Sequence, residues 1–99
     1  MTEPEEIRYI EIKCTGLVQG VFFRAATKKM AILLGLKGWV KNLPDGSVLM
    51  NVYGRESEVN KLIKWCEKGP ILAKVSNVEV RELTTSDKVT EHKSFDITY

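Results

Sequence analysis

Few side chains in this sequence are suited to covalent, acid–base or metal chemistry. The chain has one histidine, His92, and two cysteines, Cys14 and Cys66, which lie 52 positions apart. A zinc site needs several closely spaced ligands, and a Ser-His-Asp relay needs a histidine beside its nucleophile. The spacing favours neither, so we expect no metal ion and no cofactor. The chemistry that remains would use arginine, asparagine and backbone amides.

Residues 16–24, Gly-Leu-Val-Gln-Gly-Val-Phe-Phe-Arg, combine two glycines with an arginine at the start of a predicted helix. The residues before Arg24 offer no side-chain oxygen to cap the first N–H groups of that helix. A cation in the first turn also opposes the helix dipole, by about 0.3 to 1 kcal/mol. A phosphate would remove both defects, because it accepts N–H hydrogen bonds and pairs with a guanidinium. The residues that we expect to bind it are Gln19, Gly20, Val21, Phe22, Phe23 and Arg24.

This loop differs from better-known phosphate loops, and a simpler interpretation stays open. A P-loop has Gly-Lys-Ser or Gly-Lys-Thr after its first glycine and four further residues, whereas Val21 is the fifth residue after Gly16. A tyrosine-phosphatase-like nucleophile would be a cysteine where this chain has Val18, so we expect no covalent intermediate. A glycine loop before a helix, followed by a solvated arginine, is also typical of a purely structural turn.

Alternating and helical patterns predict the elements that position this loop. Strands are expected over 7–15, 37–42, 48–54, 75–83 and 95–99, and helices over 23–34 and 56–68. This order predicts an α+β fold, the ferredoxin-like α/β sandwich βαββαβ with a short additional C-terminal strand. Two helices would cover one face of an antiparallel sheet of order 4-1-3-2, in which the ends of the first two strands share one edge.

Hydrophobic spacing predicts which side chains enter the core. In the first helix the stripe comprises Phe23, Ala26, Met30, Leu33 and Leu34, and in the second helix it comprises Val59, Leu62, Ile63 and Cys66. Both cysteines are expected to be small core residues, with a disulfide between them as the alternative.

Composition limits the class of protein. The chain has 99 residues and is 43% hydrophobic and 28% charged, which suits a single domain over residues 1–99. A net charge of +2 is too small to indicate a nucleic-acid-binding surface. No apolar run reaches the roughly 18 residues that a membrane span needs. The opening residues 1–6 are acidic, whereas a secretory signal would be basic and then apolar. We therefore expect a cytoplasmic monomer without nucleic-acid or membrane partners.

Two blocks of the sequence resemble the acylphosphatase family. Residues 16–24 are similar to its GxVQGVxFR signature, with Phe22 at a variable position, and residues 35–48 are similar to its GLxGWVxNxxDGxV stretch. The resemblance implies a ferredoxin-like hydrolase that splits acyl phosphates into a carboxylate and inorganic phosphate. It implies that Arg24 binds the phosphoryl oxygens and that Asn42 holds the attacking water, with inorganic phosphate as product and competitive inhibitor.

Such a reaction suits a chain with so few reactive groups. The leaving carboxylate has a conjugate acid of pKa near about 4, so it departs without protonation. Binding the phosphoryl group and placing water in line are then sufficient, without a metal or a covalent intermediate.

Two other functions share parts of this pattern. RNA-binding RRM domains have the same element order, but residues 37–40 lie on the wrong strand for their motif and residues 48–53 contain one aromatic side chain. A phosphate-sensing module without turnover, as in the acylphosphatase-like domains of larger hydrogenase-maturation proteins, would use the same loop. Hydrolysis of benzoyl phosphate distinguishes an enzyme from both.

Overall fold

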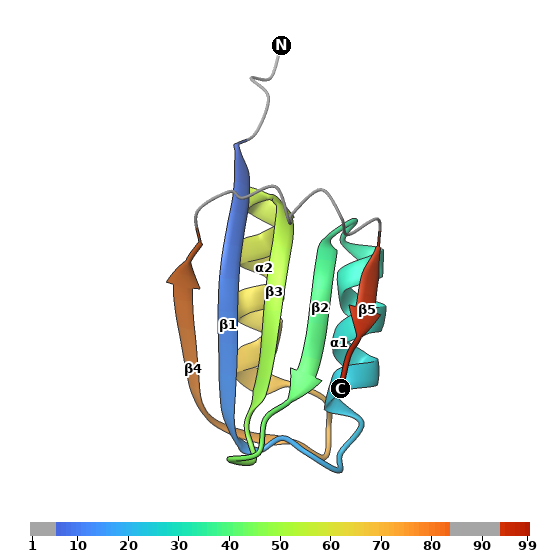
Figure 1. Cartoon of the computed structure of the whole chain (residues 1–99), viewed down its shortest axis with the longest axis vertical. Coiled ribbons are helices and arrows are strands. Elements are labelled where there is room, and N and C mark those ends of the chain that lie inside the picture. Colours follow the sequence, from blue (N-terminus) through green and yellow to red (C-terminus); the bar gives the residue numbers. More distant parts are fainter. Residues whose placement is uncertain (1–5, 84–93) are drawn as a thin grey trace.

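A computed structural model describes residues 6–83 and 94–99 of the chain (Figure 1). The elements are β1 (Ile7–Leu17), α1 (Phe23–Leu33), β2 (Lys37–Asn42), β3 (Val48–Arg55), α2 (Glu56–Lys68), β4 (Lys74–Glu82) and β5 (Phe95–Ile97). The predicted element order is confirmed, and the bounds of β2 and α2 agree with those expected. The acidic opening segment and the polar connection expected over 84–93 lie outside the described residues, apart from Glu6.

The sheet has the strand order β4-β1-β3-β2-β5, so the predicted order 4-1-3-2 is confirmed for the first four strands. Those four strands pair antiparallel. The expectation of a wholly antiparallel sheet is wrong for β5, which pairs parallel with β2 along the free edge of the sheet. Both helices lie behind the same face of this mixed sheet, and β1, β2 and β5 all run toward the same end (Figure 1).

Strict alternation along β1 explains why one face of the sheet is buried. Ile10, Ile12 and Cys14 are fully buried, while the side chains between them lie on the opposite, more open face. Val48, Met50 and Val52 of β3 continue the same buried layer. Burial of one such side chain contributes about 1.5 to 3 kcal/mol, so this layer holds the ends of the strands in place.

The buried stripe of α1 agrees in part with the predicted one, since Phe23 is buried and Met30 and Leu34 pack partly buried against the core. Phe23, Thr27 and Ala31 are buried, whereas Leu33 is 72% exposed. Residues four apart lie above one another on a helix, and Leu33 falls well off that line at about 100° per residue. At the start of α1, the Phe23 ring packs on Trp65 of α2 with ring centroids 5.7 Å apart.

The second helix packs as its spacing predicts. Val59, Leu62 and Cys66 are buried, and Ile63 is partly buried against the same core. Both cysteines are free thiols in the core, as expected of small core residues. A hydrogen bond with Cys14, together with burial, raises the pKa of the Cys66 thiol well above its ordinary value. In the part of the chain that the structure describes, neither helix has the length and apolar composition to cross a membrane.

Candidate functional site

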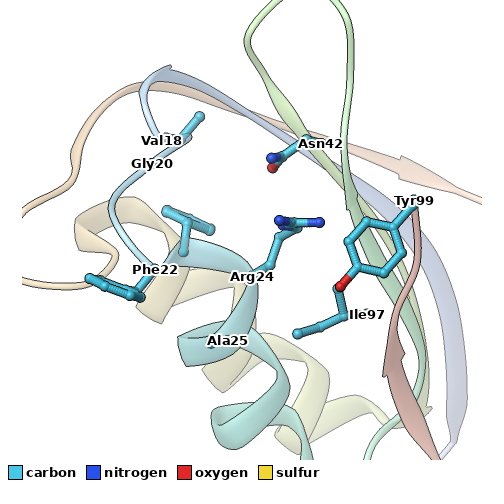
Figure 2. Close-up of a pocket in the computed structure, with 9 residues that line it drawn as sticks. Val18, Gly20, Phe22, Arg24, Ala25, Asn42, Ile97 and Tyr99 are labelled. Carbon is cyan, nitrogen blue, oxygen red and sulfur yellow. The ribbon is translucent and has the colours of Figure 1, made fainter.

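The predicted loop and the end of β2 meet at one end of the sheet, where they enclose a pocket of about 250 Å³ (Figure 2). Of the residues predicted for the site, the pocket is lined by Gly20, Phe22, Phe23, Arg24 and Asn42. It is also lined by Val18, Ala25, Ile97 and Tyr99, which were not predicted as site residues. Gln19 and Val21, which were also predicted as site residues, are not among the residues that line it.

The start of α1 has the incomplete cap that its sequence predicts. Phe22 is the N-cap residue, makes no side-chain capping hydrogen bond, and is followed by no acidic residue in the first turn. Its φ of 61° lies in the left-handed region, as does the 74° of Gly20. An aromatic residue rarely adopts this conformation, which costs about 1 to 2 kcal/mol. The strained loop turns the positive end of the helix dipole toward the pocket, where an anion is favoured.

The guanidinium of Arg24 lies inside this pocket. Its central carbon is 4.9 Å from the centroid of the Tyr99 ring, and the group extends toward Asn42 and Tyr99 (Figure 2). Within residues 6–83 and 94–99, no carboxylate forms an ion pair with it. Its two-pronged set of N–H donors is therefore available for the oxygens of a phosphoryl group.

Asn42 contributes an unusual acceptor to the same pocket. The residue ends β2, and its side-chain Oδ1 is buried without a hydrogen-bond partner among the described residues. A buried acceptor left unpaired costs about 1 to 3 kcal/mol, so such an atom calls for a partner. A water molecule in the pocket would supply the missing O–H group.

The side chain of Gln19 ties the loop to the strand end that carries Asn42. Its Nε2 donates hydrogen bonds to the carbonyl oxygens of Leu43 and Ser47, both at 2.8 Å. These two residues flank the β2–β3 turn, where Leu43 N also donates to Ser47 O at 2.8 Å. Gln19 therefore fixes the loop that precedes Arg24 against the turn that follows Asn42. Nothing in the local pattern around Gln19 indicates a bond to residues so far along the chain.

Asp45 stiffens the same turn from within. Its Oδ1 accepts hydrogen bonds from the Ser47 hydroxyl and from Ser47 N, the latter at 2.9 Å, and its Oδ2 lies 3.1 Å from the Lys13 ammonium. The bonds from Ser47, followed by the contact with Lys13, lower the pKa of Asp45 from 3.8 to about 2. The described contacts of the Asp45 carboxylate are with Ser47 and Lys13, and none is with Asn42.

Asp45→Asn is expected to destabilise the folded protein at pH 7 but not at pH 2. A carboxyl whose pKa is lowered from 3.8 to about 2 contributes stability above pH 4, and this contribution is lost as pH falls toward 2. Urea unfolding of both proteins at several pH values measures the difference. An equal difference in unfolding free energy at pH 7 and pH 2 would contradict a role for the carboxylate charge.

The sequence and the fold of this chain are both similar to those of known acylphosphatases. The profile of the acylphosphatase family matches residues 10–97. An acylphosphatase of Methylococcus capsulatus is 41% identical over 85 residues, which cover 86% of this chain and 92% of that protein. Among solved structures, an acylphosphatase from Coxiella burnetii superposes with a TM-score of 0.85 at 37% identity, over 93% of both chains. One from Bacillus subtilis gives a TM-score of 0.86 at 31% identity, over 95% of this chain and all 100% of the other.

Proposed function

Because the chain belongs to the acylphosphatase family and is an enzyme that hydrolyses acyl phosphates, we propose that Arg24 binds the phosphoryl group and that Asn42 orients the attacking water. One observation carries this proposal. The guanidinium of Arg24 lines one pocket with Asn42, whose buried side-chain oxygen has no hydrogen-bond partner among the described residues, although the two residues are 18 positions apart in the sequence. The first supplies positive charge, and the second supplies an acceptor for water.

The phosphoryl group is bound by charge and by donors. Arg24 donates two parallel N–H groups to two phosphoryl oxygens, and the main-chain N–H groups of residues 19–23 donate to the remaining oxygens. The uncapped start of α1 adds its positive dipole end. These groups are fixed before the substrate arrives, so they stabilise the charge that spreads over the oxygens in the transition state without reorganising.

The nucleophile is a water molecule held by Asn42. One water O–H donates to Asn42 Oδ1, which leaves an oxygen lone pair free to face the phosphorus. A new bond forms between the water oxygen and phosphorus while the bond from phosphorus to the acyl oxygen breaks. The electron pair of that broken bond leaves with the carboxylate, and the water proton passes to the phosphate product or to solvent. A carboxylate with a conjugate-acid pKa near about 4 leaves without a general acid.

This reaction is expected to need neither an added metal nor a titrating residue. Benzoyl phosphate hydrolysis in buffer treated with a chelator should have a kcat that is nearly constant between about pH 5 and 8, because the proposed mechanism uses no general acid or base. Inorganic phosphate should raise KM and leave kcat unchanged. In ¹⁸O-labelled water a single turnover should place the label in phosphate rather than in benzoate.

Three results would contradict the proposal. Label in benzoate would mean that water attacks the acyl carbon, and loss of activity on chelation would mean that a metal ion takes part. A bell-shaped pH profile centred near about 6.5 would point to His92, which lies outside the described residues.

We further propose a cytoplasmic, monomeric enzyme that acts as a single domain without nucleic-acid or membrane partners. The described residues share one core cluster drawn from both helices and from β1, β2, β3 and β5. Two buried free thiols suit a reducing compartment. The net charge of +2 offers little attraction for a polyanion.

A further inference from the structure

The pocket has a second side that the proposed mechanism does not use. Arg24 and Asn42 provide its polar groups, whereas apolar carbon comes from the loop and the start of α1 and, across the pocket, from Ile97 and Tyr99. Both of these residues come from β5 and the residues after it, far along the chain from the phosphate loop. A substrate with a phosphoryl group and an acyl group would find a chemically different surface for each.

Parallel pairing with β2 brings this apolar side to the pocket. Ile97 lies beside Val40 in the sheet register, and Thr98 N donates to the Val40 carbonyl at 2.8 Å. This hydrogen bond holds the chain after β5 beside Val40, which precedes Asn42 by two positions in β2. Tyr99 follows directly and reaches the guanidinium of Arg24.

Tyr99 is highly exposed although it belongs to the pocket. The residue is 94% exposed, and its ring centroid is 4.9 Å from the Arg24 guanidinium carbon. The attraction between a cation and an aromatic face holds the ring near that position. A large, exposed apolar surface at the mouth of a pocket gains favourable burial when an apolar group covers it.

We propose that the acyl group of the substrate packs against Ile97 and Tyr99, so that the enzyme favours acyl phosphates whose acyl group is apolar or aromatic. This inference rests on the proposed function, because phosphoryl binding at Arg24 decides where the acyl group lies. In-line attack places the leaving oxygen opposite the water. Ile97 and Tyr99 line the same pocket as Arg24 and Asn42, so they are within reach of a leaving group on the side of the phosphorus away from Asn42 (Figure 2).

Charge supports the same choice of substrate. Arg24 is the only cationic side chain among the described residues that line the pocket. Once its guanidinium holds the phosphoryl group, a second anionic group on the acyl side would face Ile97 and Tyr99 without a positive partner. Placing an anionic group there costs free energy, because it loses water without gaining a positive partner. An apolar acyl group avoids this cost, and its contact with the Tyr99 ring releases water from the ring.

The test compares kcat/KM for benzoyl phosphate with kcat/KM for acetyl phosphate. We expect the ratio to fall about tenfold in Tyr99→Ser and to stay within about twofold in Tyr99→Phe, because the ring and not the hydroxyl forms the apolar wall. Intrinsic reactivity differs between the two substrates, but it cancels when the ratios of two variants are compared. If loss of the Tyr99 ring also shifts the Arg24 guanidinium, kcat/KM changes for both substrates alike, and this effect cancels in their ratio.

Ile71→Ser is the matched control. Ile71 is 98% exposed in the α2–β4 connection and does not line the pocket, so the ratio should equal that of the wild type. An unchanged ratio in Tyr99→Ser, with both substrates hydrolysed, would overturn the acyl site and leave the proposed function intact.

A binding measurement keeps the two proposals separate. Calorimetry gives the affinity for phenylphosphonate relative to inorganic phosphate in the wild type and in Tyr99→Ser. The same tenfold fall in relative affinity is expected without any turnover. Failure of the wild type to hydrolyse either substrate would contradict the proposed function, whereas an unchanged relative affinity would contradict the acyl site alone.

Discussion

Arg24→Lys is expected to lower kcat/KM for benzoyl phosphate by about a thousandfold, nearly as much as Arg24→Ala. Lysine keeps the positive charge but cannot donate two parallel N–H groups to two oxygens. Its ammonium is also a compact charge, so it would not reproduce the contact that the guanidinium makes with the Tyr99 ring, whose centroid lies 4.9 Å from the Arg24 guanidinium carbon. Steady-state kinetics of both variants, with calorimetric titration by inorganic phosphate, provide the measurement.

Lys29→Ala is the control for the loss of a cation from the same helix. Lys29 is exposed and does not line the pocket, so kcat/KM should stay within about twofold of the wild type. Unchanged phosphate binding in Arg24→Lys would show that a point charge is enough, and the two-pronged contact would have to be abandoned.

Asn42→Ala is expected to lower kcat by about a hundredfold or more, while the inhibition constant of inorganic phosphate changes by no more than about twofold. The amide oxygen of Asn42 positions the water and makes no contact with the phosphoryl group in the proposed mechanism. Its loss should therefore affect the transition state more than the binding of product. Inhibition by phosphate under steady-state conditions separates the two quantities.

Asn51→Ala is a close control for this variant. Asn51 also carries a buried Oδ1 without a described partner, but it lies on β3 between the inward-facing Met50 and Val52, and therefore on the face of the sheet away from the helices. Its substitution should leave kcat unchanged. Equal losses of turnover and phosphate affinity in Asn42→Ala would instead indicate that the pocket as a whole had collapsed.

Local patterns were sufficient to predict most of the elements. Alternation along β1 and helical spacing along α2 depend only on neighbouring residues, and the structure confirms both. The incomplete cap before Arg24 was likewise visible in the residue types, and the structure shows the helix starting without a side-chain cap. The left-handed conformation of Phe22 was not predictable, because residue preference argues against it.

The order of the first four strands was predicted, but other contacts between distant segments were not visible in the sequence. The parallel pairing of β5 with β2 depends on which sheet edge is free after the other strands have assembled, and no local signal records this. Tyr99 was consequently expected to be only a strand residue, whereas it lies over Arg24. The stripe of α1 was predicted only in part, because hydrophobicity favoured Leu33, whereas the helical spacing from Phe23 places Thr27 and Ala31 on the buried side.

The double hydrogen bond from Gln19 has a consequence for how substrate is captured. It joins the loop to a turn 24 to 28 positions later through hydrogen bonds within the protein, so the fold itself holds the two halves of the site together. Ordering of these segments is complete before any substrate arrives. The free energy of binding the phosphoryl group therefore does not have to offset the entropy cost of ordering the loop and the turn.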